Sequence, residues 1–249
     1  MARAAAPAQG RGVGVVVASS TDGVHFTPVC RIARDDFGAE SFEKPCLVRL
    51  DDGWRLYLSC STPGFKHWWV ESLTAPTLEA LPDGERHVVL PGDEHWGVKD
   101  PVVVRRADGW HAWLCCHPPD VPGHEDRMST RYLTSADGLA WDDHGVVLTD
   151  GTGDWDDRGA RVTTVASWEP LVLLYDGRPD AAANWYETTG AARLVDGALE
   201  RLPQVRVFSP HSDGACRYAS VVELPDGTRR VYAQVARPDG AHDLVTNSC

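Results

Sequence analysis

Hydrophobic residues along this chain occur in short runs that end at turn signals, not in long helical stripes. Val13–Ala18 and Pro101–Val104 are typical runs, and eleven Asp-Gly pairs are spread along the sequence. Windows longer than about ten residues with apolar positions at i, i+3, i+4 and i+7 do not occur. Asp-Gly favours tight hairpin turns because glycine adopts a positive φ at no steric cost. The pattern therefore predicts an all-β chain built from hairpins.

One hairpin pattern recurs at a long period. Residues 43–59 and 99–115 both contain two charged residues, a proline, an apolar strand, Asp-Gly-Trp and a second strand with alternating large residues. Their turn glycines, Gly53 and Gly109, are 56 positions apart. Residues 217–233 form a third copy, and residues 161–176 form a fourth with a degraded turn. Repetition at such a period indicates a repeat architecture.

A second hairpin type gives each repeat four strands. Residues 131–141 resemble the N-terminal residues 15–26, and four-stranded repeats are typical of a β-propeller. At this spacing, 249 residues hold more than four repeats but fewer than five. We therefore expect a five-bladed β-propeller over residues 13–249 whose first blade is incomplete at the N-terminus, preceded by a disordered segment over residues 1–12. The alternative is a four-bladed propeller closed by the N-terminal strands.

The charge and composition of the chain limit the kinds of molecule that we expect it to bind. The chain has 24 Lys and Arg against 36 Asp and Glu, a formal net charge of -12. This charge opposes binding to nucleic acid or to an anionic membrane surface. No apolar run approaches the roughly 20 residues of a transmembrane helix, and the first residues lack the apolar core of a secretory signal. We expect a cytoplasmic protein, and the sequence leaves its oligomeric state open.

Cysteine and histidine positions do not indicate a metal site. The seven cysteines are an odd number, Cys115 and Cys116 are adjacent, and no Cys or His spacing of zinc type occurs. The sequence also lacks a phosphate-binding loop and a dinucleotide fingerprint. We therefore expect reduced thiols, no metal and no other cofactor.

Several short motifs, taken in order, resemble those of a known group of enzymes. They are residues 20–26 (Ser-Thr-Asp-Gly-Val-His-Phe), 43–45 (Glu-Lys-Pro) and 99–101 (Lys-Asp-Pro), with inner strands that end in Asp-Gly-Trp. Together they resemble the five-bladed propeller glycoside hydrolases and phosphorylases: arabinanases and xylosidases, invertase-like enzymes and mannoside phosphorylases. The resemblance implies a small glycoside or oligosaccharide substrate, with Glu43 as general acid and Asp100 as its electrostatic partner. Such a pair suits glycoside cleavage, which needs one protonated and one ionised carboxyl group.

Departures from that pattern favour a second hypothesis. In the hydrolases the base or nucleophile is an aspartate early in the first blade, within the half-blade expected to be missing here. Their glutamate motif follows the Asp-Pro motif, whereas Glu43 precedes Asp100. Lys44 stands where the phosphorylases have an aspartate. The alternative function is therefore a non-catalytic carbohydrate-binding propeller or a truncated pseudoenzyme.

Cations at the strand starts suggest how a substrate is held. Lysine occurs only three times, and Lys44 and Lys99 occupy equivalent strand starts. Arg161 and Arg217 begin the other two inner strands. Together these four cations predict a positive channel mouth that binds substrate oxygens, such as those of a carboxylate- or phosphate-bearing sugar. The alternative is that they form ion pairs between blades.

Aromatic and acidic side chains complete the predicted binding site. The chain has 10 Trp but only 5 Phe, and an indole offers a flat face on which a sugar ring can stack. We expect Trp96 and Trp185 to serve in this way, with packing between blades as the alternative. Tyr218 and Asp176 are also expected to contact the substrate, although Asp176 could instead cap its own turn.

Overall fold

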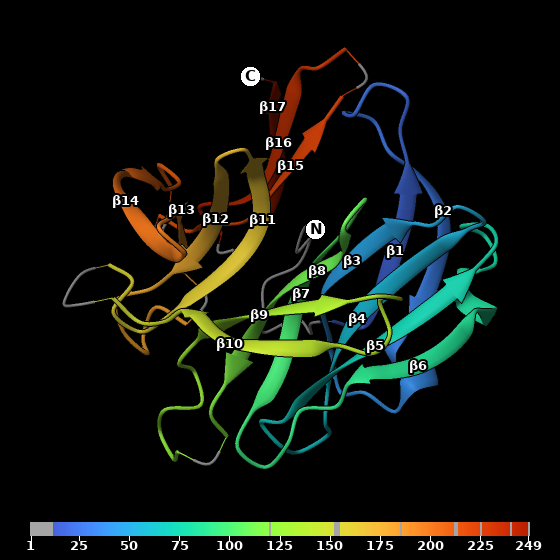
Figure 1. Cartoon of the computed structure of the whole chain (residues 1–249), viewed down its shortest axis with the longest axis horizontal. Coiled ribbons are helices and arrows are strands. Elements are labelled where there is room, and N and C mark those ends of the chain that lie inside the picture. The colour runs from blue at the N-terminus through green and yellow to red at the C-terminus, as the bar shows by residue number, and fades with distance from the viewer. Residues whose placement is uncertain are drawn as a thin grey trace. The chain divides into compact units, whose positions relative to one another are not determined.

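The computed structural model describes residues 12–119, 121–151, 155–184, 186–211, 214–224, 226–239 and 241–248. In these residues the regular elements are β-strands and two short 3-10 helices, η2 (Arg34–Phe37) and η3 (Leu81–Asp83). Strands that follow one another in the sequence are neighbours in each sheet (Figure 1). The all-β prediction and the predicted hairpins are therefore confirmed.

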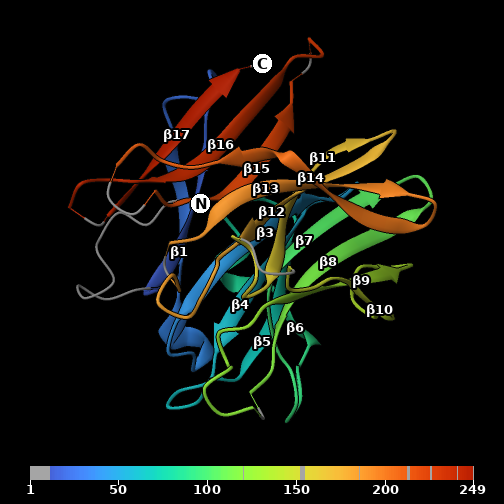
Figure 2. The same cartoon turned by 90° about the vertical axis from the view of Figure 1, so that its left-hand side faces the viewer.

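The strands form five sheets. The first is a pair, β1 (Gly14–Ser19) and β2 (Thr27–Ala33). The second contains β3 (Phe42–Arg49), β4 (Trp54–Ser61), β5 (Trp68–Ala75) and β6 (Glu85–Leu90). The third contains β7 (Gly97–Arg106), β8 (Gly109–His117), β9 (Ser129–Ser135) and β10 (Asp142–Leu148). The fourth contains β11 (Ala160–Trp168), β12 (Leu171–Gly177), β13 (Thr188–Val195) and β14 (Ala198–Val207). The fifth contains β15 (Cys216–Glu223), β16 (Arg229–Ala236) and β17 (His242–Ser248), which lie side by side in Figure 2.

The repeated antiparallel sheets are the blades of a β-propeller, but the expected count of five blades is wrong. The described residues form four blade sheets, and β1 and β2 form a separate pair. The reason is that residues 12–41, the described chain before β3, hold one hairpin and η2 but no inner strand pair. The expectation that the N-terminal blade is incomplete agrees with this pair. Gly12 is described, and its carbonyl accepts a hydrogen bond from the Phe42 amide, whereas residues 1–11 lie outside the described residues.

By its internal packing the chain divides into two compact units. The N-terminal unit comprises residues 12–125 and 132–144, and the C-terminal unit comprises residues 126–131 and those from 145 onward. The core of the N-terminal unit shows why its strands are apolar on both faces. Leu56 and Leu58 of β4 pack in one hydrophobic cluster, and Tyr57 between them packs in a second. Because strand side chains alternate between faces, β4 is covered on both sides.

A bulge follows the start of each inner strand. The pairing register shifts between Glu43 and Cys46 in β3, and between Lys99 and Val102 in β7. Pro45 lies inside the first of these irregularities, where a proline is tolerated because no ladder hydrogen bond is lost. Similar shifts follow the first residues of β11 and β15. Bulges bend a strand and redirect side chains, so they set the direction of the charged residues at these starts.

Among the described residues, no helix is both long and apolar enough to cross a membrane.

Candidate functional site

In the N-terminal unit the structure brings together Glu43, Lys99 and Asp100. The Lys99 ammonium nitrogen lies 2.6 Å from Glu43 Oε2 and 4.0 Å from Asp100 Oδ2. It also lies 4.8 Å from the centre of the Trp68 ring, a cation–π contact that the sequence analysis missed. All four side chains are buried. Two carboxylates from successive inner strands therefore share one ammonium group in a site of low polarity.

The Asp100 backbone is strained. Its φ is 53°, in the left-handed region, although it is not glycine and precedes a proline, which disfavours compact backbone conformations. Its amide donates a hydrogen bond of 2.8 Å to Ser59 Oγ, and the residue is fully buried. Backbone strain of this kind persists only where the surrounding structure imposes it, and it concentrates at functional sites.

Three further residues were predicted to bind substrate: Lys44, Trp96 and Trp185. Lys44 is buried in β3, next to Glu43. Trp96 is half-buried and packs against the hydrophobic cluster that contains Val98 and Leu114. This contact agrees with its alternative role in packing, and its role in sugar stacking stays a prediction. Trp185 lies outside the described residues.

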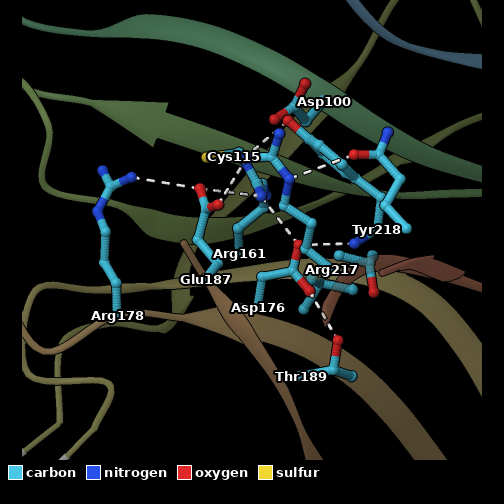
Figure 3. Close-up of polar contacts among 12 residues, drawn as sticks. Asp100, Cys115, Arg161, Asp176, Arg178, Glu187, Thr189, Arg217 and Tyr218 are labelled. Atoms are coloured by element: carbon cyan, nitrogen blue, oxygen red, sulfur yellow. Dashed lines mark hydrogen bonds and ion pairs between the residues drawn. The ribbon is translucent and has the colours of Figure 1, made fainter. Parts of the chain in front are cut away.

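In the C-terminal unit the structure brings Arg161, Arg217, Tyr218 and Asp176 together (Figure 3). Arg161 Nη2 lies 2.9 Å from Asp176 Oδ2, and Arg161 Nη1 donates to Tyr218 Oη at 3.1 Å. Arg217 pairs instead with Glu187, with 2.7 Å between Nη1 and Oε2. The strand-start arginines therefore form ion pairs. The Arg161–Asp176 pair joins neighbouring strands of one sheet, so it is not the ion pair between blades that the alternative interpretation expected. Contact of these arginines with a substrate stays a prediction.

Tyr218 occupies the same place in β15 as Asp100 does in β7. It directly follows a strand-start cation, and its φ is 52°. Its amide donates to Asp176 Oδ2 at 2.9 Å, much as the Asp100 amide donates to Ser59. The Tyr218 ring centre lies 4.1 Å from the guanidinium carbon of Arg161 and 5.2 Å from that of Arg217. The left-handed residue thus places an aromatic ring beside two guanidinium groups.

Sequence analysis missed two residues of this cluster, Glu187 and Arg178. The Glu187 carboxylate lies within 3.3 Å of nitrogens from Arg161, Arg178 and Arg217. Arg178 also donates to Asn184 Oδ1 at 2.6 Å. Glu187 directly precedes β13, the third strand of its sheet, and none of the repeated sequence motifs marks that position. An isolated acidic residue before the apolar strand 188–195 was the available signal.

The two acids of the cluster have opposite electrostatic environments. Burial alone raises the pKa of Glu187, but Arg217, Arg161 and Arg178 together lower that pKa to about 2. Burial also raises the pKa of Asp176, and here the partly opposing effect of Arg161 leaves the pKa above its ordinary value. Glu187 is therefore ionised at neutral pH, and Asp176 is the acid of this cluster that takes up a proton more readily.

The N-terminal unit also contains a thiol and an imidazole in contact. Cys115 Sγ lies 3.5 Å from His117 Nε2, and Cys115 pairs in register with Lys99. His117 Nδ1 lies 3.1 Å from the carbonyl oxygen of Glu125, which fixes the ring orientation.

Within the described part of the chain, no group of three or more His, Cys, Asp or Glu side chains is arranged to hold a metal ion.

The sequence matches no protein-family model, and it has no significant match among curated proteins. Its structure, in contrast, resembles many solved structures. A thermostable family-43 glycoside hydrolase matches with a TM-score of 0.75 at 15% identity, over 94% of this chain and 81% of the other. The β-1,2-mannobiose phosphorylase from Listeria innocua matches with a TM-score of 0.69 at 16% identity, over 93% of this chain and 66% of the other. Sucrose-6-phosphate hydrolase from Lactobacillus gasseri matches with a TM-score of 0.63 at 13% identity, over 93% of this chain and 51% of the other.

These three matches belong to the groups that the motifs resemble: family-43 hydrolases, mannoside phosphorylases and invertase-like enzymes. The chain spans about two thirds of the phosphorylase and about half of the sucrose-6-phosphate hydrolase. At these identities the likeness concerns the fold, because one fold supports many activities. The chain thus has the β-propeller fold of these glycoside hydrolases and phosphorylases.

Proposed function

We propose that the protein binds a small glycoside or oligosaccharide and hydrolyses its glycosidic bond, with Glu43 and Asp100 as the catalytic carboxyl groups. The observation that carries this proposal is their shared contact with Lys99, at 2.6 Å and 4.0 Å, in a buried site at the starts of two inner strands. A pair of close carboxyl groups is what glycoside hydrolysis needs. The shared fold of known glycosidases supports the same reaction class.

The positions of the three groups suggest how their roles divide. At 2.6 Å the Lys99 ammonium favours the ionised form of Glu43, and a general acid must instead carry a proton. Movement of Lys99 toward Asp100 or toward a substrate oxygen would release Glu43 to take up that proton. Asp100 would remain ionised and stabilise positive charge that develops on the sugar ring. Substrate binding would therefore allow Glu43 to take up the proton that a general acid donates.

A second candidate function is carbohydrate binding without catalysis. The same Glu43–Lys99 ion pair favours it, because an acid that stays paired with an ammonium group has no proton to donate. In this case the carboxylates would accept hydrogen bonds from sugar hydroxyl groups. The two functions share a ligand class and differ only in turnover.

Aryl glycosides of arabinose, xylose and mannose, tested with the wild type and with Glu43→Gln and Asp100→Asn, separate the two functions. For the hydrolase we expect kcat to fall at least about 100-fold in each variant, the usual contribution of an acid–base group. Glu71→Gln is the matched control, because Glu71 is a buried carboxylate in β5, a strand of the same sheet as Glu43, and it pairs with Arg86. Unchanged turnover in both variants would exclude the catalytic roles. Sugar binding with no turnover in the wild type would establish the binding function instead.

A further inference from the structure

The left-handed backbone at Asp100 decides where its carboxylate lies. In an extended strand, successive side chains point to opposite faces of the sheet, so the side chain of Asp100 would point away from that of Lys99. In the structure, Asp100 Oδ2 instead lies 4.0 Å from Lys99 Nζ. Asp100 has a φ of 53° and lies within the irregular part of the β7 pairing, which redirects its side chain. The pair of carboxylates in the proposed site therefore depends on the backbone conformation of one residue.

A buried hydroxyl group contacts the backbone at this point. The Asp100 amide donates a hydrogen bond of 2.8 Å to Ser59 Oγ, and Ser59 is 0% exposed. Ser59 lies on β4 directly opposite Glu43, and residues directly opposite each other in antiparallel strands share a face of the sheet. Lys99 Nζ in turn lies 2.6 Å from Glu43 Oε2. These four residues therefore form a closed set of contacts that joins β3 and β4 to β7.

The same arrangement recurs at the start of β15. Tyr218 has a φ of 52°, and its amide donates to Asp176 Oδ2 at 2.9 Å. Asp176 lies on the second strand of its sheet, directly opposite the strand-start residue Arg161, which is the position that Ser59 has in its own sheet. Both left-handed residues at strand starts thus donate their amides to a side-chain oxygen at the equivalent position of another sheet.

The start of β11 has a different backbone. There the residue after the cation is Val162, and its amide donates at 3.0 Å to the hydroxyl of Thr130, on the third strand of another sheet. Val162 is not among the described residues with a positive φ. The left-handed conformation therefore accompanies an acceptor on the second strand, and a cation at the strand start does not suffice for it.

We propose that Ser59 is a positioning residue of the carbohydrate site: its hydroxyl oxygen holds Asp100 in the left-handed conformation and so places the Asp100 carboxylate beside Lys99. A left-handed backbone is unfavourable for a residue other than glycine, and a buried amide that loses an acceptor is destabilised. Without the Ser59 oxygen we therefore expect an extended Asp100, whose carboxylate points away from Lys99. The inference rests on the proposed function in that Asp100 acts on a bound sugar.

Turnover of the aryl glycosides by Ser59→Ala, Ser59→Thr and Ser72→Ala tests this role. We expect Ser59→Ala to lower kcat at least about ten-fold and to leave KM within about two-fold, because a misplaced carboxylate weakens binding of the transition state more than binding of the substrate. Ser59→Thr keeps the hydroxyl, the group with which Thr130 accepts a strand-start amide, and should restore kcat to within about three-fold.

Ser72→Ala is the matched control. Ser72 is a fully buried serine in β5 of the same sheet, and its Oγ has no hydrogen-bond partner among the described residues. The control thus removes the same atom without removing a hydrogen bond, and its kcat should equal that of the wild type.

Crystal structures of the variants give a readout that does not need turnover. In Ser59→Ala we expect a negative φ at Asp100 and a carboxylate out of contact with Lys99, whereas Ser59→Thr should keep both features. A positive φ at Asp100 in Ser59→Ala would overturn the inference, and so would a kcat of Ser59→Thr as low as that of Ser59→Ala. If Ser59→Ala does not fold, Ser59→Val replaces it under the same criteria, because it has the shape of Ser59→Thr without the hydroxyl.

The two readouts separate this inference from the proposed function. A wild type without turnover would refute the hydrolase alone, because the φ of Asp100 in the crystal structures still decides the role of Ser59. A changed φ with an unchanged kcat would confirm that Ser59 positions Asp100 and would refute the catalytic role of Asp100.

Discussion

Replacing Glu187 by glutamine is the most informative single change for the buried cluster. The carboxylate contacts three arginines and is 2% exposed. Glutamine has nearly the same shape and keeps one acceptor oxygen, so the change removes mainly the negative charge. Three guanidinium groups would then lose the carboxylate that all of them contact. We expect the variant to fold but to be much less stable, because it leaves buried positive charge uncompensated.

The magnitude follows from the titration of Glu187. Its pKa falls from an ordinary 4.5 to about 2 in the folded protein, where Arg217, Arg161 and Arg178 outweigh the effect of burial. At 1.36 kcal/mol per pKa unit, this corresponds to about 3 kcal/mol. Loss of one partner from a buried ion pair costs about 3–5 kcal/mol by an independent route. Because the folded pKa is the lower one, this stability is complete above about pH 4.5 and is lost as the pH falls toward 2.

Urea unfolding followed by tryptophan fluorescence and circular dichroism, at pH 7 and pH 3, measures the effect. We expect Glu187→Gln to lower the free energy of unfolding by about 3 kcal/mol at pH 7. At pH 3 the difference from the wild type should shrink by about 2 kcal/mol, because the wild-type carboxylate is then losing its advantage. Glu85→Gln is the control. Glu85 is 73% exposed and pairs with His87 at the surface, so the effect of this change should stay within about 0.5 kcal/mol.

Two outcomes would refute this reasoning. If the free energy of unfolding fell by less than about 1 kcal/mol at pH 7, the Glu187 carboxylate would contribute little net stability through its arginine partners. An equal loss at pH 7 and pH 3 would mean that shape and hydrogen bonding matter, and not charge.

Further predictions concern other parts of the fold. Lys99→Met should lower the free energy of unfolding in urea by about 3–5 kcal/mol, because it leaves Glu43 buried without its ammonium partner. Adding Glu43→Gln should recover at least half of the lost stability. A double variant no more stable than Lys99→Met would count against the ion pair. Thr130→Val should lower the free energy of unfolding by about 2 kcal/mol in the same measurement. The Thr130 hydroxyl accepts a hydrogen bond from the Val162 amide at 3.0 Å and donates one to the Ala160 carbonyl at 2.9 Å. Unchanged stability would show that these backbone groups find other partners. Asp196→Ala should lower stability by about 1 kcal/mol, because Asp196 has a φ of 49° at an exposed turn; an unchanged melting midpoint would contradict this.

The strands could be predicted from the sequence because the sequence patterns that specify a strand are local. Alternation and Asp-Gly turns act over a few residues, so the hairpins at 43–59 and 99–115 appear in the structure where the pattern placed them. The same repetition located the strand starts that hold Glu43, Lys99, Arg161 and Arg217. The number of blades was not readable, because a repeat period predicts the content of a blade but does not fix how an incomplete N-terminal repeat pairs.

The sequence by itself determined the fold class, the repeat and the positions of the strand-start charges. The tertiary structure decided which charges meet. Glu187 lies 30 positions from Arg217 and 26 from Arg161, and pairing at that separation depends on strand register and on the bulges that redirect the first residues of each inner strand. The left-handed backbone at Asp100 and Tyr218 has the same origin, because contacts distant in the sequence impose it. Strand periodicity specifies the face on which a side chain lies, and only the packing of strands specifies what it touches.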